Sequence, residues 1–82
     1  MFSADRIDKL LRDKLPDCRA KVNDDMNDGE HFSAEVASSA FVGKSLVQQH
    51  QLVYQALGDH MRREIHALQL KTYTPDRWPH PE

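Results

Sequence analysis

The spacing of the apolar residues switches along this chain between the period of a helix and the period of a strand, and this succession limits the fold more than any other feature. Residues 4–15 show the helical period first, after a plausible N-cap at Ser3 and before a stop at Pro16. The apolar positions of this stretch are Ile7, Leu10, Leu11 and Leu15. We therefore expect the chain to open with a helix from about Ala4 to Leu15.

Strict alternation follows in two runs, which predicts two half-buried strands joined by a hairpin loop. The apolar residues are Cys18, Ala20 and Val22 in the first run and Phe32, Ala34 and Val36 in the second. Between the runs lie turn-forming and acidic residues, from Asn23 to Glu30. Since successive side chains of a strand point to opposite faces, the face opposite to the apolar set should carry His31, Ser33 and Glu35.

The second half of the chain returns to the helical period and then to alternation. One helix is expected from about Ser45 to Leu57, with an apolar stripe of Leu46, Val47, His50, Val53, Tyr54 and Leu57, and a shorter one at about 59–63 after a break at Gly58. Residues 66–73 predict a third strand, followed by a helical turn at 74–78 and a frayed tail at 79–82. The order αββααβ indicates a small α+β sandwich with its helices on one face of a three-stranded sheet.

Length and composition limit the classes of function. A chain of 82 residues is expected to form one domain, 1–82, with little room for both a core and a deep substrate pocket, which counts against an enzyme. With a formal net charge of −2, any nucleic-acid binding must rest on a local basic patch. The single cysteine excludes an internal disulfide and favours a reducing compartment. We expect neither a signal peptide nor a membrane-spanning helix.

Two motifs that could carry chemistry have simpler interpretations. Gly43-Lys44-Ser45 follows a strand and opens a helix, as a phosphate-binding loop does, but a Walker A loop needs a glycine where Ser38 stands. A turn with Ser45 as the helix cap is the better interpretation. Cys18 is expected to be a small buried residue rather than a reactive thiol.

The five histidines are interpreted one by one, because histidine is the commonest metal ligand. His80 lies in the tail, His60 is expected on the surface, and His50 is expected to be a buried, hydrogen-bonded residue that points toward the sheet. His31, taken alone, is typical of a loop histidine. For His66, which opens the third strand, a structural and a functional role stay equally open.

Several segments together closely resemble the BolA-like family, over nearly the whole chain. They are FVGKSLVQQHQLVYQAL at 41–57, IHAL at 65–68, KTYTP at 71–75, and Trp78. The end of the first helix at Leu15-Pro16 and the segment DGEHF at 28–32 also match the family's pattern. The resemblance implies a fold related to the class II KH fold but without its Gly-x-x-Gly nucleic-acid loop, since GDHM at 58–61 joins the two helices here.

BolA-like proteins are known chiefly as partners of monothiol, CGFS-type glutaredoxins in iron–sulfur cluster and iron homeostasis, so the resemblance implies an adaptor rather than an enzyme. In a shared [2Fe–2S] cluster, the glutaredoxin cysteine and its bound glutathione leave two ligand positions. By the family's pattern these fall to His66 and, in the hairpin loop, to His31. The isolated chain is then expected to hold no cofactor, to be a monomer or weak dimer, and to be cytoplasmic or in an organelle matrix, away from membranes.

Some relatives are linked to transcription, so the alternative is a KH-like DNA-binding regulator whose basic residues would be Arg62, Arg63, Lys71 and Lys44. Two departures weaken it: Gln49-His50-Gln51 stands where many relatives carry Arg-His-Arg, and residues 24–35 hold five acids without Lys or Arg, which would repel phosphate. A third departure concerns Asp28, which occupies an earlier loop position where some relatives place their ligand and is poorly suited to a soft cluster.

Overall fold

The structure, a computed structural model, describes residues 2–65 and 67–81. Its elements are α1 (Ala4–Lys14), β1 (Arg19–Asp24), β2 (His31–Ala37), the 3-10 turn η1 (Ser39–Phe41), α2 (Leu46–Leu57), α3 (His60–Arg63), β3 (Ala67–Tyr73) and the 3-10 turn η2 (Pro75–Arg77). The strands form one sheet in the order β1-β2-β3, in which β1 and β2 are antiparallel and β2 and β3 parallel. The predicted α+β order is confirmed, and the three helices lie within one residue of their predicted bounds.

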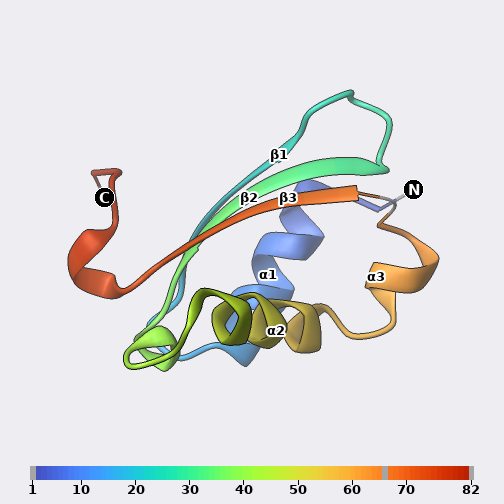
Figure 1. The fold of residues 1–82 in the computed structure, drawn as a ribbon. Coiled ribbons are helices and arrows are strands. Elements are labelled where there is room, and N and C mark those ends of the chain that lie inside the picture. Colours follow the sequence, from blue (N-terminus) through green and yellow to red (C-terminus); the bar gives the residue numbers. More distant parts are fainter. Residues whose placement is uncertain (1, 66, 82) are drawn as a thin grey trace.

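The helices α1 and α2 lie on the same side of the sheet, and the core lies between them and the strands (Figure 1). The alternation predicted for β2 is confirmed by burial: Phe32, Ala34 and Val36 are buried, while His31, Ser33 and Glu35 are partly exposed on the other face. A parallel neighbour needs a crossover connection, which η1, α2 and α3 provide between β2 and β3. The start of β3 is thereby brought beside the start of β2.

The inward face of α2 differs from the predicted apolar stripe. Leu46, Val47 and Tyr54 are exposed, whereas Val53, Ala56 and Leu57 are buried. A polar residue, Gln49, occupies part of the inner face because its amide is fully used there. The amide nitrogen donates to the carbonyl of Lys44 (3.0 Å), and the amide oxygen accepts from the hydroxyl of Thr72 (2.6 Å). Helical spacing therefore predicted the helix and two of its buried residues, Val53 and Leu57, but it wrongly included Leu46, Val47 and Tyr54 in the inward face.

The turn before α2 is the strand-to-helix turn expected from the sequence. Gly43 has a φ of 76°, a conformation that glycine adopts without strain. Ser45 caps α2: its hydroxyl accepts the backbone N–H of Gln48 (3.2 Å), and the Gln48 side chain accepts the backbone N–H of Ser45 (3.0 Å). This capping box satisfies two donors that would otherwise be unpaired at the helix start.

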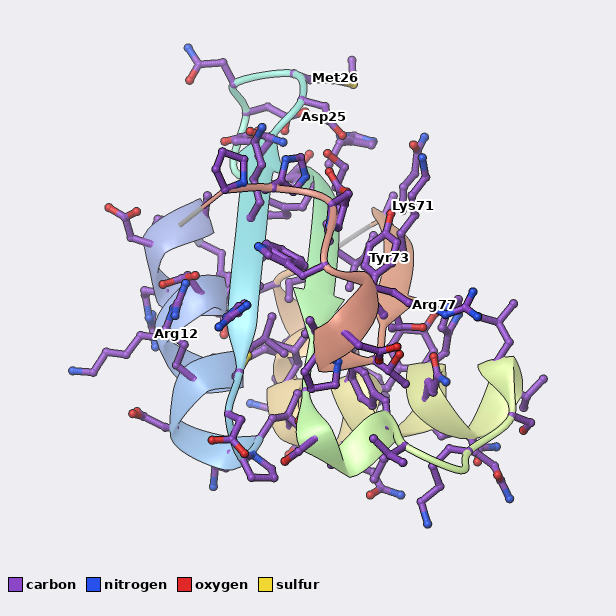
Figure 2. All side chains as sticks on the ribbon, turned by 90° about the vertical axis from the view of Figure 1, so that its left-hand side faces the viewer. Arg12, Asp25, Met26, Lys71, Tyr73 and Arg77 are labelled. Atoms are coloured by element: carbon purple, nitrogen blue, oxygen red, sulfur yellow. The ribbon has the colours of Figure 1, made fainter. Side chains whose placement is uncertain are left out.

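The described part of the tail, to residue 81, packs on the open face of the sheet (Figure 2). His80 Nε2 lies 3.0 Å from Glu35 Oε1, and the His80 ring packs edge-on against Trp78, with centroids 5.2 Å apart. The bond from His80 is the main reason why the pKa of Glu35 lies below its usual value. This contact could not be predicted from local sequence patterns, because Glu35 belongs to β2 and is far from the tail along the chain.

Candidate metal-binding site at His31

The loop between β1 and β2 is held in shape by Asp24, the last residue of β1. Its two carboxylate oxygens accept the backbone N–H groups of Asp28 (3.2 Å) and Gly29 (2.9 Å). Asn27 and Gly29 have positive φ angles of 53° and 72°, which asparagine and glycine adopt more readily than other residues. The acidic, turn-forming residues of the sequence thus build a defined turn that leads into β2.

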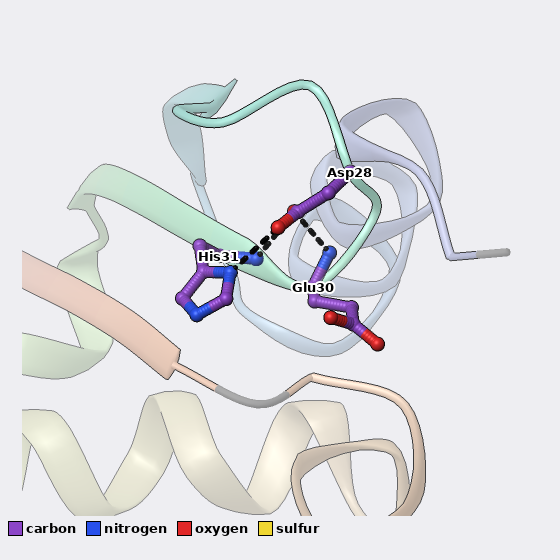
Figure 3. Close-up of side chains that lie close together, drawn as sticks. All are labelled: Asp28, Glu30 and His31. Carbon is purple, nitrogen blue, oxygen red and sulfur yellow. Dashed lines mark hydrogen bonds and ion pairs between the residues drawn. The ribbon is translucent and has the colours of Figure 1, made fainter.

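Asp28 joins this turn to the first residue of β2. Its Oδ1 accepts the backbone N–H groups of Glu30 (2.9 Å) and His31 (3.1 Å), and its Oδ2 lies 2.8 Å from Nδ1 of the His31 ring (Figure 3). The hydrogen bond from Glu30, ahead of those from His31, holds the pKa of Asp28 below its usual value. Asp28 is therefore a carboxylate near neutral pH, and a carboxylate can only accept a hydrogen bond from the ring nitrogen that faces it.

His31 stands at the end of β2 that lies beside the start of β3. Its side chain is 42% exposed, and its partner in the parallel register is Ala67. Figure 3 shows the second ring nitrogen, Nε2, on the side of the ring away from Asp28 and toward β3. The orientation predicted by alternation, away from the core, is confirmed. The ring thus holds one nitrogen against Asp28 and presents the other outward.

Asp28, Glu30 and His31 also lie close enough to share a cation, since one ligand atom of each falls within 4.8 Å of the others. The Asp28 carboxylate, however, already accepts two backbone N–H groups and faces the ring of His31, so most of its acceptor capacity is in use. Carboxylates are hard ligands, whereas imidazole also suits iron and other transition metals. The arrangement therefore favours His31 as the metal-binding donor and the carboxylate of Asp28 as its support.

The other residues singled out in the sequence are not all gathered here. His66 lies outside the described residues; it directly precedes Ala67, the register partner of His31. The basic residues of the DNA-binding alternative are spread over the surface: Arg62 and Arg63 on α3, Lys71 on the open face of the sheet, and Lys44 before the opposite end of α2. They form no single patch in the described part of the chain.

Two further histidines differ from the sequence-based expectations. His50 is only half-buried, and its buried Nε2 has no hydrogen-bond partner among the described residues, so the predicted hydrogen bond is wrong. Its ring instead packs edge-on near Tyr54, with centroids 6.5 Å apart. His60 is not a simple surface residue: its Nδ1 lies 2.5 Å from Glu64 Oε1, and its ring lies 4.8 Å from that of Phe2. These contacts are structural and lie outside the His31 site.

Cys18 has the character of an inert thiol, as predicted. It is half-buried and packs against the core. Burial raises the pKa of the Cys18 thiol to about 11 and outweighs the opposite effect of the Arg12 guanidinium, which donates to the carbonyls of Cys18 and Ala20. Only the thiolate is a nucleophile or a metal ligand, so Cys18 is poorly suited to either role near neutral pH.

We expect Cys18 to react with iodoacetamide at about pH 8 roughly 100-fold more slowly than a free thiol such as glutathione, whose thiolate is far more populated at that pH. Mass spectrometry of the alkylated chain measures the rate. The same chain unfolded in urea is the control, and its rate should rise to that of the free thiol. Equal rates for the folded and unfolded chains would contradict the assignment.

Asp28 is the site residue whose role the sequence analysis missed, because it was considered there only as a poor cluster ligand. A signal was present: an aspartate readily accepts backbone N–H groups two and three residues further on, and His31 stands three residues after Asp28. That spacing allows the same carboxylate to reach the His31 ring. Sequence patterns do not show which of its two oxygens would do so.

Comparison with known proteins shows which family this chain resembles. A family model of BolA-like proteins matches residues 12–77. The chain is 37% identical over 81 residues to the "DNA-binding transcriptional regulator BolA" of Vibrio cholerae, covering 90% of this chain and 76% of that protein. It is 36% identical over 83 residues to "Protein BOLA2" of Arabidopsis thaliana, covering 99% of this chain and 88% of that protein.

Solved structures share the same arrangement of elements. A BolA protein homologue from Coxiella burnetii has a TM-score of 0.82 and 40% sequence identity, with 98% of this chain and 100% of that chain covered. BolA1 from Arabidopsis thaliana has a TM-score of 0.79 and 31% identity, with 93% and 95% covered. Within residues 2–65 and 67–81, no helix combines the length and the apolar character needed to cross a bilayer.

Proposed function

This chain belongs to the BolA-like protein family, and on that premise we propose that it is an adaptor that binds a monothiol glutaredoxin and, through His66 and His31, supplies two ligands to a shared [2Fe–2S] cluster. The observation that carries the proposal is the state of His31. Its ring is partly exposed, stands at the end of the sheet, and has Nδ1 bonded to a carboxylate while Nε2 points outward. A metal-binding imidazole needs one such outward nitrogen.

The register of the sheet supports a second ligand from the same end of the molecule. His31 pairs with Ala67 across the parallel strands β2 and β3, and Ala67 directly follows His66 in the chain. A second histidine that directly precedes the register partner of His31 in the sequence suits the two positions that a glutaredoxin cysteine and glutathione leave open.

The donor set also fits a cluster better than a hard cation. Imidazole nitrogens bind iron, and two of them in place of thiolates on one iron raise the reduction potential of a [2Fe–2S] centre. In this chain the Asp24–Asp28 turn fixes where His31 begins β2, and the buried neighbour Phe32 holds that strand against the core. The described part of the chain thus contributes His31, held at the end of the sheet, to a cluster whose iron, sulfide and thiolate ligands come with the partner.

The test is visible circular dichroism of the chain mixed with a monothiol glutaredoxin and glutathione and reconstituted with iron and sulfide. Wild type should give a spectrum that differs from that of the glutaredoxin cluster alone. His66→Ala should remove this difference. His31→Ala should weaken it at least ten-fold, because removal of a residue that merely supports a metal ligand already weakens metal binding by about 10–100-fold and His31 is proposed as a ligand itself. His80→Ala is the matched control. It removes a histidine of the tail, which pairs with Glu35 of β2, and it should leave the spectrum unchanged.

A wild-type mixture whose spectrum equals that of glutaredoxin alone would contradict the proposal.

DNA binding is the second candidate, favoured by the name of the Vibrio cholerae relative and by the adjacent Arg62 and Arg63 on α3. The side chain of Arg62 is 79% exposed. Binding of duplex DNA at low salt, lost in Arg62→Ala/Arg63→Ala, would then support this second function. The separation of these arginines from Lys44 and Lys71 makes it the weaker candidate.

A further inference from the structure

We propose that Asp28 is a positioning residue for His31, which holds the proton of that imidazole on Nδ1 and so makes Nε2 the metal-binding atom. The inference rests on the proposed function and assigns a role that the sequence pattern did not suggest. It is carried by the 2.8 Å contact between Asp28 Oδ2 and His31 Nδ1. Metal-binding histidines commonly donate their second ring N–H to a carboxylate, which fixes both the tautomer and the orientation of the ring.

The carboxylate of Asp28 is itself held in place by backbone groups of the loop. Its Oδ1 accepts the backbone N–H groups of Glu30 and His31, and the Asp28 backbone N–H donates to Asp24. The side chain therefore cannot turn away from the ring without breaking bonds of the loop. A support of this kind is rigid before any metal or partner arrives, so His31 needs little reorganisation when it binds.

Support by Asp28 and direct ligation by Asp28 make different demands. As a ligand it would have to share its oxygens between the metal and the three groups that already contact them, and its hard oxygen would suit an iron–sulfur cluster poorly. As a support it keeps all three bonds while Nε2 stays on the opposite side of the ring, toward β3 (Figure 3). The geometry fits the supporting role with no rearrangement of the loop.

The substitution Asp28→Asn tests this assignment. The amide oxygen of asparagine can still accept the two backbone N–H groups, so the turn should persist, but an NH₂ group would replace the oxygen that faces Nδ1. An NH₂ group donates, and Nδ1 must then act as the acceptor. We therefore expect Asp28→Asn to move the ring proton of His31 from Nδ1 to Nε2, the atom required for the metal.

The first measurement is a long-range ¹H–¹⁵N NMR correlation of the free chain, at a pH where the imidazole is neutral. Wild-type His31 should carry its proton on Nδ1, and Asp28→Asn should carry it on Nε2. Glu30→Gln removes an equal charge from the same loop and should leave the wild-type tautomer. A wild-type His31 protonated on Nε2 would overturn the proposal, whatever the variants do. No glutaredoxin is present, so this result is independent of the proposed function.

The second measurement is the mixed-cluster circular dichroism signal with glutaredoxin, glutathione, iron and sulfide. Asp28→Asn should weaken cluster binding about ten-fold, the lower end of the usual effect of removing a carboxylate support. In a His31→Ala background the same substitution should have no further effect, because Asp28 acts through His31. An equal loss in both backgrounds would show that Asp28 acts directly or through the loop as a whole. It would reject the supporting role while leaving the adaptor function in place.

Discussion

Replacing Leu57 by alanine is expected to lower the free energy of unfolding by about 2–5 kcal/mol. Leu57 ends α2 and is only 1% exposed, in the core cluster that joins the helices to the sheet. The substitution removes buried methyl groups and leaves a cavity that the packed core can only partly fill. A domain of this length has a total stability of roughly 4–12 kcal/mol, so the loss would be a large share of the whole.

Urea unfolding followed by far-ultraviolet circular dichroism measures this change, and Leu46→Ala is its matched control. Leu46 lies in the same helix and undergoes the same chemical change, but it is 62% exposed. Its substitution should alter the free energy of unfolding by less than about 0.5 kcal/mol. Similar losses in the two variants would show that the apolar stripe predicted from the sequence, which contained both leucines, is the inward face after all.

This pair of leucines shows what helical spacing can and cannot predict. The spacing identified the helix, its cap at Ser45 and its end at Gly58 because these depend on neighbouring residues. It identified only part of the inward face, because Leu57 is buried as predicted whereas Leu46 is exposed. Gln49 lies on the inward side instead, where it reaches Lys44 and Thr72 by hydrogen bonds. A glutamine is counted as polar in any hydropathy pattern, although its amide can be satisfied inside the protein. Only the tertiary structure supplies those partners.

At the candidate site, too, some features were predicted from the sequence and others were not. Alternation in β2 predicted that His31 faces away from the core, and the family resemblance singled it out as a ligand; its outward orientation is confirmed. The spacing of Asp28 and His31 allows a contact between them, but whether it forms depends on a turn in which Asn27 and Gly29 take positive φ angles and bring one carboxylate oxygen to the ring. His66 lies outside the described residues, so its role stays a prediction.

Replacing Ser38 by alanine should lower the free energy of unfolding by about 1–3 kcal/mol, the usual cost of leaving a buried polar partner unsatisfied. Ser38 is fully buried; its hydroxyl donates to the carbonyl of Pro16 (2.6 Å) and accepts the backbone N–H of Ala40 (3.1 Å). The sequence drew attention to Ser38 only because a Walker A loop would need glycine there. In the structure it fastens the segment after β2 to the connection between α1 and β1.

The neighbouring Ser39→Ala is the matched control for Ser38→Ala in the same urea titration. The Ser39 hydroxyl approaches the same Pro16 carbonyl but only to 3.5 Å, in a more exposed position, so its loss should cost less than about 0.5 kcal/mol. Ser38 follows the end of β2 opposite to His31. Ser38→Ala should therefore weaken the fold while leaving the His31 tautomer and the mixed-cluster signal unchanged at temperatures where the chain is folded. A changed tautomer would mean that the two ends of β2 are coupled, and effects at His31 could then no longer be assigned to its own loop.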